Sequence, residues 1–204
     1  MDSQRLRNKF NRQAVLFEQE KKLGVLNKWR KKLIPFAEGN VLELAVGAGG
    51  NLPFYRNGVH VTALDISNKM LTKAENVARK GQLDVILILG NAETIQFNEN
   101  QFDTVVSTLS FCGYDNPERM LRRAIYWLKP GGTLLLLEHG ISDSATIASI
   151  QNKVDPFAKC IIGCHQNRRI ESMIRELPVK IEVHESFLKD IFHLVQATSL
   201  KHVL

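Results

Sequence analysis

The chain has 204 residues, 44% of them hydrophobic and 24% charged, which suits one globular domain over 1–204 and excludes a disordered or fibrous chain. No apolar run approaches the roughly 20 residues of a membrane span, and the first residues lack the apolar core of a secretory signal. Cys112, Cys160 and Cys164 are few and odd in number, which favours a reducing compartment over a disulfide framework. We therefore expect a cytoplasmic protein.

The net charge of +6 lies in the N-terminal part of the chain. Residues 1–40 hold 10 of the 27 basic residues and 4 of the 21 acidic residues, so the remainder keeps 17 of each sign. Such a segment can attract an anionic membrane, a nucleic acid or an acidic substrate. The alternative is the solvated face of two helices. Membrane-peripheral contact through residues 1–40 is thus one of two open interpretations.

The first predicted elements form an N-terminal helical cap over residues 1–38. Residues 3–36 predict two helices broken near Gly24, because apolar side chains recur at helical spacing: Leu16, Leu23, Leu26, Trp29 and Leu33. From residue 39, strands and helices alternate. We expect strands at 41–45, 59–65, 85–89, 102–108 and 133–138. Between them we expect a helix that starts at 51–55 with Asn51 as its cap, one from Ser67 to Lys80, and one over 117–128.

The pattern changes after residue 138. Residues 145–162 and 167–176 predict two helices, and residues 179–187 and 191–199 predict two strands joined by a short turn. Alternating strand and helix units followed by a terminal hairpin indicate an α/β fold with an open, doubly wound sheet over 39–204.

The first loop of this sheet joins a strand to a helix and reads Glu43-Leu44-Ala45-Val46-Gly47-Ala48-Gly49. Gly47 and Gly49 lack Cβ atoms, so a ligand can lie against the main chain. A nicotinamide-binding loop would carry a third glycine at Leu52, and Glu43 would repel its pyrophosphate. Glu43 suits the cationic amino group of a methionine moiety instead.

Two further loops follow the next strands. Asp65 ends the second strand, where a carboxylate can accept hydrogen bonds from both ribose hydroxyls of an adenosine. Gly90-Asn91-Ala92-Glu93 follows the third strand. The Asn91 side chain can accept from an adenine amino group, with a loop cap as the alternative role, and the Ala92 N–H can donate to the ring.

The motif series at 41–49, 65–71, 90–93, 102–106 and 128–132 resembles that of class I S-adenosylmethionine-dependent methyltransferases. The resemblance covers roughly residues 9–200 and is greatest to the type 11 subgroup, which includes quinone, phospholipid and thiol methyltransferases. It implies a Rossmann-like, seven-stranded sheet of order 3-2-1-4-5-7-6 with strand 7 antiparallel. The implied cofactor is S-adenosyl-L-methionine, which leaves as S-adenosyl-L-homocysteine.

The resemblance also implies site residues. Those expected at the cofactor are Phe10, Glu43, Ala45, Gly47, Gly49, Asn51, Asp65, Ile66, Met70, Asn91, Ala92, Glu93, Thr108 and Leu109. Phe10, Asn11 and Arg12 stand where the family often has a Tyr-Asp helix over the cofactor, so the tyrosine hydroxyl is replaced by a phenyl ring. The family often has glycine at Ala45 and aspartate at Asn91.

Five residues are expected at the methyl acceptor: Cys112, Tyr114, His139, His165 and Arg168. His139 is the candidate catalytic group, as a base or as a polarising group, and a structural histidine is its alternative. His165 and Arg168 can meet an acidic substrate group or serve as a cap and a surface contact. Cys160, Cys164 and His165 lack a fourth ligand, so no metal site is expected.

The expected function is methyl transfer to a small-molecule or lipid-like acceptor: a thiol, a quinone ring carbon or a phospholipid amine. Proximity and orientation can supply much of the catalysis, so the lack of an obvious acid–base pair does not exclude an enzyme. Residues 107–111 lack the Asn/Asp-Pro-Pro-aromatic run of base amino methylation, which disfavours nucleic acid as a substrate. A non-catalytic cofactor-binding or RNA-associated module is the alternative. The protein is expected to be a monomer or a homodimer.

Overall fold

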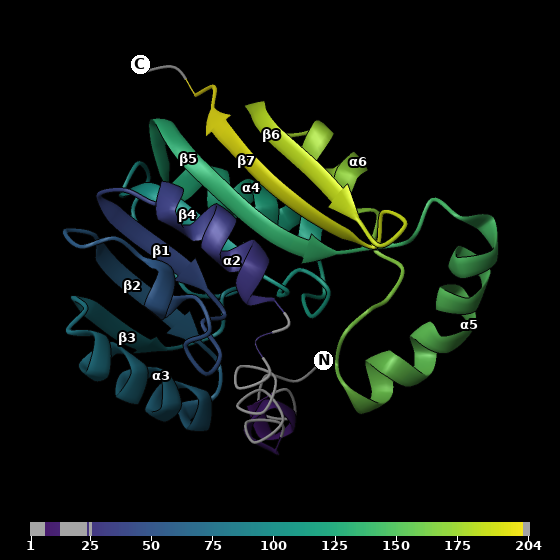
Figure 1. Ribbon diagram of the computed structural model, residues 1–204, viewed down its shortest axis with the longest axis horizontal. Helices are drawn as coiled ribbons and strands as arrows, with labels where there is room; N and C mark the ends of the chain where they lie inside the picture. The colour runs from purple at the N-terminus through teal and green to yellow at the C-terminus, as the bar shows by residue number, and fades with distance from the viewer. Residues whose placement is uncertain (1–6, 13–23, 25, 202–204) are drawn as a thin grey trace.

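The computed structural model describes residues 7–12, 24 and 26–201, which form an α/β fold around a seven-stranded sheet (Figure 1). The strand order is β3-β2-β1-β4-β5-β7-β6, and β7 runs antiparallel to both of its neighbours. The expected topology is therefore confirmed. The strands are β1 (Asn40–Leu44), β2 (His60–Asp65), β3 (Val85–Leu89), β4 (Phe102–Thr108), β5 (Leu128–His139), β6 (Val179–Phe187) and β7 (Phe192–Ser199).

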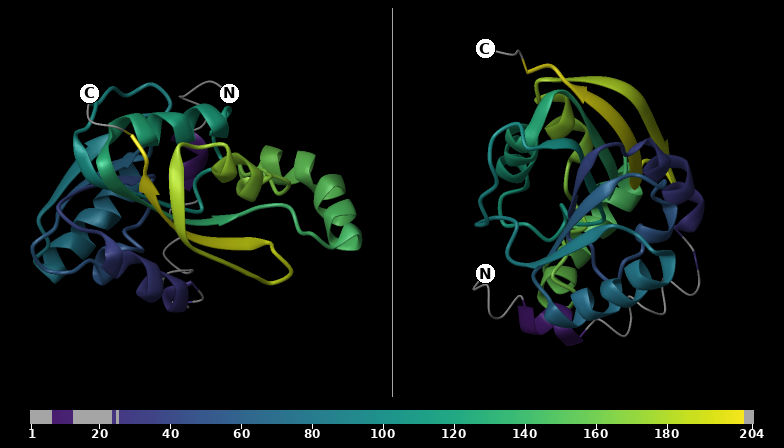
Figure 2. Two further views of the ribbon diagram at one scale, coloured as in Figure 1. Left: turned by 90° about the horizontal axis from the view of Figure 1, so that it is seen from above. Right: turned by 90° about the vertical axis from the view of Figure 1, so that its left-hand side faces the viewer.

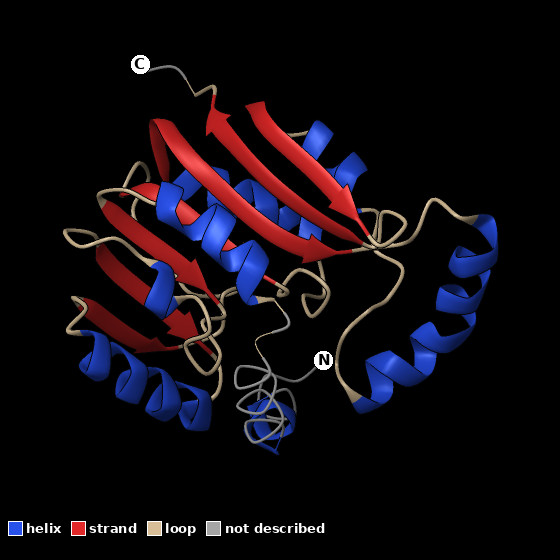
Figure 3. Cartoon of the chain, viewed as in Figure 1, coloured by secondary structure: helices blue, strands red, loops and turns tan. Residues whose placement is uncertain are grey.

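Helices cover both faces of the sheet (Figures 2 and 3). On one face, α2 (Asn27–Leu33), the 3₁₀ turns η1 (Ile34–Phe36) and η2 (Leu52–Phe54), and α3 (Asn68–Gly81) bury one apolar cluster. On the other face, α4 (Pro117–Trp127) and α6 (Ile170–Arg175) bury a second cluster. The central strands are buried on both sides, which explains why residues 134–137 are an unbroken run of leucine.

Helix α3 shows how local sequence sets an element beside the site. The Ser67 hydroxyl accepts a hydrogen bond from the Met70 N–H and caps the first turn. Met70, Leu71, Ala74 and Ala78 then recur on the buried face. The helix ends at Gly81, as the sequence predicts. Its cap therefore places Ser67 and Met70 directly after the carboxyl end of β2.

The helix predicted at 167–176 is the shorter α6, and two other predicted elements differ more from the structure. The helix expected at 51–55 is only the single 3₁₀ turn η2, because the Asn51 side chain does not cap it and instead donates to Glu43 and Thr108. Strand β5 begins at Leu128 rather than at residue 133, and it pairs with β4 through a register shift. Proline and two glycines fit there because a bulged strand start tolerates them.

Helix α5 (Ala145–Ile161) stands away from the sheet in Figure 1 and contributes only Asp155 to the interior. Four of its exposed apolar side chains recur at helical spacing: Ile150, Val154, Phe157 and Ile161. Within the described residues, no helix combines the length and apolar character that crossing a membrane requires. The apolar side chains of α5 therefore form a surface stripe.

Only part of the predicted N-terminal cap falls within the described residues. Residues 7–12 are helical, α2 follows Leu26, and residues 1–6, 13–23 and 25 lie outside the description. Residues 7–12 cross from α3 to α5. The Ser67 hydroxyl hydrogen-bonds to the Asn11 side-chain oxygen at 2.6 Å, and the Lys9 ammonium donates to the backbone oxygens of Lys159 and Cys160.

Candidate functional site

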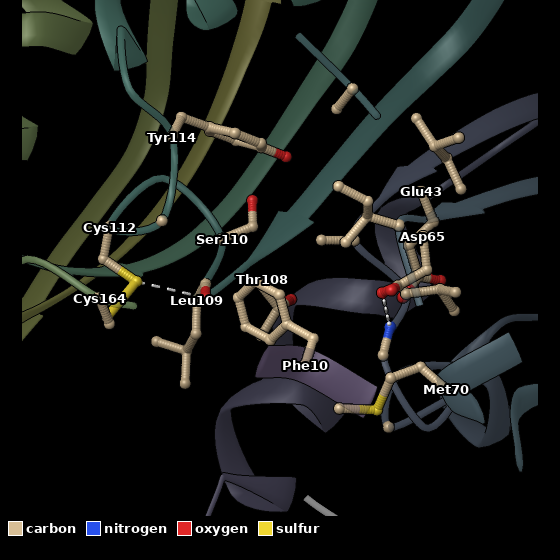
Figure 4. Close-up of a pocket in the computed structure, with 18 of the residues that line it drawn as sticks. Phe10, Glu43, Asp65, Met70, Thr108, Leu109, Ser110, Cys112, Tyr114 and Cys164 are labelled. Carbon is tan, nitrogen blue, oxygen red and sulfur yellow. Dashed lines mark hydrogen bonds between the residues drawn. A yellow bond between two sulfur atoms is a disulfide. The ribbon is translucent and has the colours of Figure 1, made fainter. Parts of the chain in front are cut away.

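A cavity of about 280 Å³ opens at the carboxyl edge of the parallel strands. The ends of β1, β2, β4 and β5, the segment 7–12 and the loop after α5 supply its walls. Figure 4 shows Glu43, Asp65 and Met70 on one side, Cys112, Cys164 and Tyr114 on the other, and Phe10 between them. We call the two sides the carboxylate side and the sulfur side. Open α/β sheets bind their ligands at this edge.

Glu43 is buried at the end of β1, with 1% of its surface exposed. One carboxylate oxygen accepts from the Asn51 amide at 3.0 Å, and the other accepts from the Tyr55 hydroxyl at 2.9 Å. Burial raises the pKa of Glu43 to about 7, although these hydrogen bonds and the charge of Arg30 favour the ionised form. A cationic group that enters the cavity would lower this pKa and favour the ionised form of Glu43.

Asp65 ends β2 and is also buried. Its two oxygens accept from the backbone N–H groups of Gly47 and Ser67, at 2.9 and 2.8 Å. Burial raises the pKa of Asp65 to about 6 despite these hydrogen bonds. Each carboxylate oxygen has a second lone pair, so Asp65 can still accept hydroxyl groups from a ligand.

The two glycines of the first loop have different positions. Gly47, at φ +55°, lines the cavity, and a Cβ there would meet only a backbone oxygen at 3.9 Å. Gly49, at φ +77°, lies outside the lining, and a Cβ there would come within 3.0 Å of the Ala74 Cα. This glycine lets the loop pack against α3, and a ligand contact at Gly49 stays a prediction. Ala45 lines the cavity with φ +51°, which is uncommon for a residue with a Cβ.

In the loop after β3, some residues line the cavity and others do not. Asn91, Ala92 and Ile66 line the cavity, as expected. The Asn91 side-chain oxygen accepts from the Glu93 N–H at 2.9 Å, which is the loop-cap role that the sequence left open. Glu93 lies outside the lining, and its carboxylate accepts from the backbone N–H groups of Asp115 and Asn116 ahead of α4. The structure thus shows a capping role for Glu93, and its contact with the cofactor stays a prediction.

Arg30 lines the cavity, although the sequence did not predict it as a site residue. It is 6% exposed, and its guanidinium would lie 3.0 Å from a Cβ at Gly50. Arg30 stands between Leu26 and Leu33 on the buried stripe of α2. A cation at an apolar position of a helix is a signal that could have identified it.

Phe10 closes the cavity from the N-terminal segment, beside Met70 and Thr108 (Figure 4). The contacts of Asn11 with Ser67 and of Lys9 with the end of α5 hold this segment at both ends. Phe10 thus lines the cavity, and its contact with a cofactor stays a prediction.

The sulfur side contains most of the features that the sequence did not predict. Three residues predicted at the methyl acceptor line it, Cys112, Tyr114 and His139, together with Leu109, Cys164 and Ile162. Cys112 and Cys164 form a disulfide, with their Cα atoms 4.8 Å apart. The prediction against disulfides is therefore wrong for this pair, because 52 residues of separation hide the proximity from the sequence.

His139 ends β5, and its Nε2 lies 3.0 Å from the Cys164 Sγ. Burial lowers the pKa of His139 to about 4, so its imidazole is neutral near pH 7. Burial also raises the pKa of Tyr114, which keeps its hydroxyl protonated. The sulfur side therefore carries no net charge from these two groups.

A buried carboxylate beneath the sulfur side fixes its shape. Glu138 accepts from the Ser107 hydroxyl and from the backbone N–H groups of Ser110 and Phe111. Leu109 next to them has φ +53°, a strained conformation for a branched residue. The carboxylate thus holds the loop after β4 in the conformation that presents Leu109 and Cys112 to the cavity.

His165 and Arg168 do not reach the cavity. The Nδ1 of His165 lies 2.9 Å from a carboxylate oxygen of Asp155, and Arg168 donates to the Tyr114 backbone oxygen at 2.7 Å. Both groups tie the loop after α5 to its neighbours, which agrees with the structural alternative, and contact with an acidic substrate group stays a prediction.

Comparison with known proteins finds methyltransferases among the proteins that this chain resembles. A family model described as a methyltransferase domain matches residues 42–136. A phosphatidylethanolamine N-methyltransferase of Cereibacter sphaeroides is 30% identical over 135 residues, 65% of this chain and 66% of the relative. The thiol S-methyltransferase TMT1B of Rattus norvegicus is 33% identical over 136 residues, 64% of this chain and 56% of the relative. The chain thus spans about two thirds or less of these relatives' lengths.

The fold has a matching solved structure. The structure of an S-adenosylmethionine-dependent methyltransferase of Thermotoga maritima superposes with a TM-score of 0.68. The two share 18% sequence identity, and the match covers 96% of this chain and 99% of the other. At this identity the likeness establishes the fold, which places the cavity at the strand edge where such folds bind ligands.

Proposed function

Because the chain belongs to the class I S-adenosylmethionine-dependent methyltransferases, we propose that it transfers the methyl group to the sulfur of an apolar thiol. The observation that carries this proposal is the composition of the sulfur side. Among the described lining residues, the carboxylates are Glu43 and Asp65, and both lie on the opposite side. The acceptor therefore meets apolar side chains, sulfur, uncharged hydroxyl groups and a neutral imidazole.

The residues of the carboxylate side fit the cofactor. Two buried carboxylates with raised pKa values face a cavity that holds one buried cation, Arg30, among its described lining. We propose that Asp65 accepts the ribose hydroxyls, that Glu43 faces the methionine amino group, and that Arg30 faces the methionine carboxylate. Gly47 leaves main chain open to the ligand, and Asn91, Ala92 and Ile66 would flank the adenine.

When bound, S-adenosylmethionine supplies a methyl carbon on a cationic sulfur. The protein must then bring a nucleophile into line and exclude water, which can supply about 7–11 kcal/mol of a reaction barrier in well-oriented cases. Phe10, Leu109 and Ile162 would exclude water, and Tyr114 keeps a hydroxyl donor at the cavity. These residues orient the acceptor and need not take a proton from it.

The acidity of the acceptor group distinguishes a thiol acceptor from an amine acceptor. A thiol with a pKa of about 8.5 is ionised to a few per cent at pH 7 without help, and its thiolate is strongly nucleophilic. An alkylammonium, with a pKa of about 10.4, must first lose a proton to a base. His139, with its pKa lowered to about 4, is too weak a base for that step. A thiol therefore suits the sulfur side better than an amine.

The apolar stripe on α5 supports an acceptor that partitions into lipid. Ile150, Val154, Phe157 and Ile161 are 57%, 44%, 68% and 71% exposed, and α5 leads directly into the cavity residues Ile162 and Gly163. Lys153 and Lys159 lie exposed on the same helix. An amphipathic helix of this kind binds in the interfacial layer of an anionic membrane. We propose that α5 rests on a lipid surface and takes up the acceptor there.

A matched acceptor series tests the proposal. The full chain is incubated with S-adenosylmethionine carrying a deuterated methyl group and with a long-chain alkyl thiol, alcohol or amine of one skeleton. We expect a labelled thioether from the thiol and at least tenfold slower turnover of the other two. Fast methylation of the amine with none of the thiol would contradict it.

A phospholipid amine is the second candidate, and the α5 stripe favours it as well. Vesicles containing phosphatidylethanolamine serve as its test. Labelled N-methyl lipid formed faster than labelled thioether would establish this function and exclude the first.

A further inference from the structure

Cys112, Cys164 and His139 form a cluster that the reaction described so far does not use. Their sulfur and nitrogen atoms all lie within 4.8 Å of one another. The three residues come from separate elements: the loop after β4, the loop after α5 and the end of β5. Cys112 and His139 are 4% and 9% exposed, so water has little access to the cluster from outside the cavity.

Hydrogen bonds that do not involve sulfur hold these elements together. The His165 N–H donates to the Cys112 backbone oxygen at 2.9 Å, and the Ile141 N–H donates to the Arg168 backbone oxygen at 2.8 Å. Asp155 accepts from the Gln166 N–H at 2.6 Å and fixes the loop that carries Cys164. The two cysteines and the histidine therefore stay adjacent when the sulfur–sulfur bond is reduced.

The donor atoms define what such a reduced cluster can bind. Two thiolates and one imidazole are the soft ligands that zinc prefers, and hard cations such as Mg²⁺ require oxygen ligands that the cluster lacks. Three protein ligands with one open position are typical of a catalytic zinc site. All three residues line the cavity, so the open position would face the acceptor.

We propose that Cys112, Cys164 and His139 bind a zinc ion in the reduced protein, with its fourth coordination position open to the cavity. Two equivalents of a low-molecular-weight thiol reduce the disulfide to two cysteine thiols and leave as one small disulfide. Zinc then binds both sulfurs as thiolates, and two protons pass to the solvent. Rotation of the freed side chains separates the sulfurs to the roughly 3.7 Å that two Zn–S bonds of about 2.3 Å need.

The role of this zinc rests on the proposed function. A thiol acceptor at the open position loses its proton to solvent and binds as a thiolate, because a metal-bound thiol is deprotonated. The bound thiolate attacks the cofactor methyl group, the bond from methyl to the cationic sulfur breaks, and a neutral thioether leaves the metal. Oxidation of the cysteine pair removes two ligands and would release the zinc.

Metal binding is measurable without activity. The full chain is reduced with a phosphine, incubated with Zn²⁺, separated from free metal and analysed by elemental mass spectrometry. Co²⁺ in place of Zn²⁺ reports thiolate ligands through sulfur-to-cobalt charge-transfer absorption. We expect one zinc per reduced chain, none in the protein oxidised to the disulfide, and at least a tenfold loss of affinity in Cys112→Ser and Cys164→Ser. Cys160→Ser, at an exposed free cysteine, is the matched control and keeps full binding.

The outcomes separate this proposal from the proposed function. Reduced wild type without zinc, or serine variants that bind zinc like wild type, would overturn the metal site. S-adenosylhomocysteine affinity, measured by calorimetry on the same samples, reports the fold and the cofactor site. A wild-type protein that binds zinc and S-adenosylhomocysteine but methylates no thiol would leave the metal site standing and refute the thiol acceptor.

Discussion

The two sides of one cavity differ in how they are built. The carboxylate side consists of successive loops at the ends of β1, β2 and β3, and its carboxylates are held by backbone N–H groups and neighbouring side chains. The sulfur side joins the ends of β4 and β5 to the loop after α5, across a long stretch of chain. The carboxylate side is a polar surface held by hydrogen bonds, and the sulfur side is a mainly apolar surface that contains a disulfide. The donor of the methyl group is therefore defined more closely than its acceptor.

The largest effect is expected from Asp65→Ala. It removes the acceptor for the ribose hydroxyls and leaves the Gly47 and Ser67 N–H groups without their partner. Hydrogen bonds to a charged group contribute about 1.5–3 kcal/mol, which corresponds to roughly 10–150-fold weaker S-adenosylhomocysteine binding. Calorimetry measures this. Asp84→Ala, which removes an exposed carboxylate paired with His60, is the control, and equal affinity of the two variants would refute the role of Asp65.

Arg30→Met should weaken S-adenosylhomocysteine binding about tenfold, since one charge-assisted hydrogen bond to the methionine carboxylate is lost. The methionine side chain keeps the packing of the stem. The matched control is Lys31→Met on the exposed face of α2. If decarboxylated S-adenosylhomocysteine loses as much affinity in Arg30→Met as the parent compound does, Arg30 does not bind that carboxylate.

The carboxylate side should also make binding depend on pH. Glu43 has a pKa of about 7 in the folded protein and Asp65 of about 6, so both hold protons at slightly acid pH. A ligand amino cation favours ionised Glu43, so affinity should rise as pH rises through about 7 and level off above it. Calorimetry in buffers of different ionisation enthalpy should show proton release on binding. Glu43→Gln should remove most of that release, and an unchanged release would contradict this assignment.

The same pKa values affect stability with a definite sign. In the ligand-free protein both carboxyls bind protons more tightly when folded than when unfolded, so their stabilising contribution is complete at acid pH. It is lost as pH rises through about 6 and then about 7.

We propose that α5 delivers the acceptor to the sulfur side. Changes in its apolar stripe should therefore reduce vesicle binding and leave cofactor binding almost unchanged. Phe157→Ser with Ile161→Ser should reduce flotation with anionic vesicles several-fold, since two exposed apolar side chains no longer enter the interface. S-adenosylhomocysteine affinity should stay within twofold of wild type. Ile86→Ser, at an exposed apolar residue of β3, is the control. Loss of vesicle binding in the control alone would show that another face meets the lipid.

The smallest effect on binding is expected from Glu93→Gln. This side chain caps the backbone ahead of α4 and does not line the cavity. The variant should lose up to about 1 kcal/mol of unfolding free energy, measured by denaturant titration, with unchanged S-adenosylhomocysteine affinity. A tenfold loss of affinity would restore Glu93 to the cofactor site.

The difference between the two sides also explains how far the sequence could predict them. Glu43, Gly47 and Asp65 lie at or just after the ends of strands that the alternating pattern predicts, and the ends of parallel strands meet at one edge. Gly49 and Glu93 belong to the same motifs, but packing and capping, which spacing does not encode, turn them away from the cavity. Motifs thus identified the loops more reliably than the direction of each side chain.

On the sulfur side, tertiary contacts determine which residues lie next to one another. Cys164 lies close to Cys160 and His165 in sequence, yet the structure pairs it with Cys112 and places it beside His139. The contact between His165 and Asp155, which orients this loop, joins it to α5, and α5 stands away from the sheet (Figure 1). No local pattern shows this arrangement.

A crystal structure of the reduced protein with S-adenosylhomocysteine and an iodinated aryl thiol would test most directly how the two sides divide donor and acceptor. We predict the ribose at Asp65 and the iodine signal on the sulfur side, with the thiol sulfur beside Cys112, His139 and Cys164. A thiol bound away from this side, or a ribose that does not contact Asp65, would contradict it.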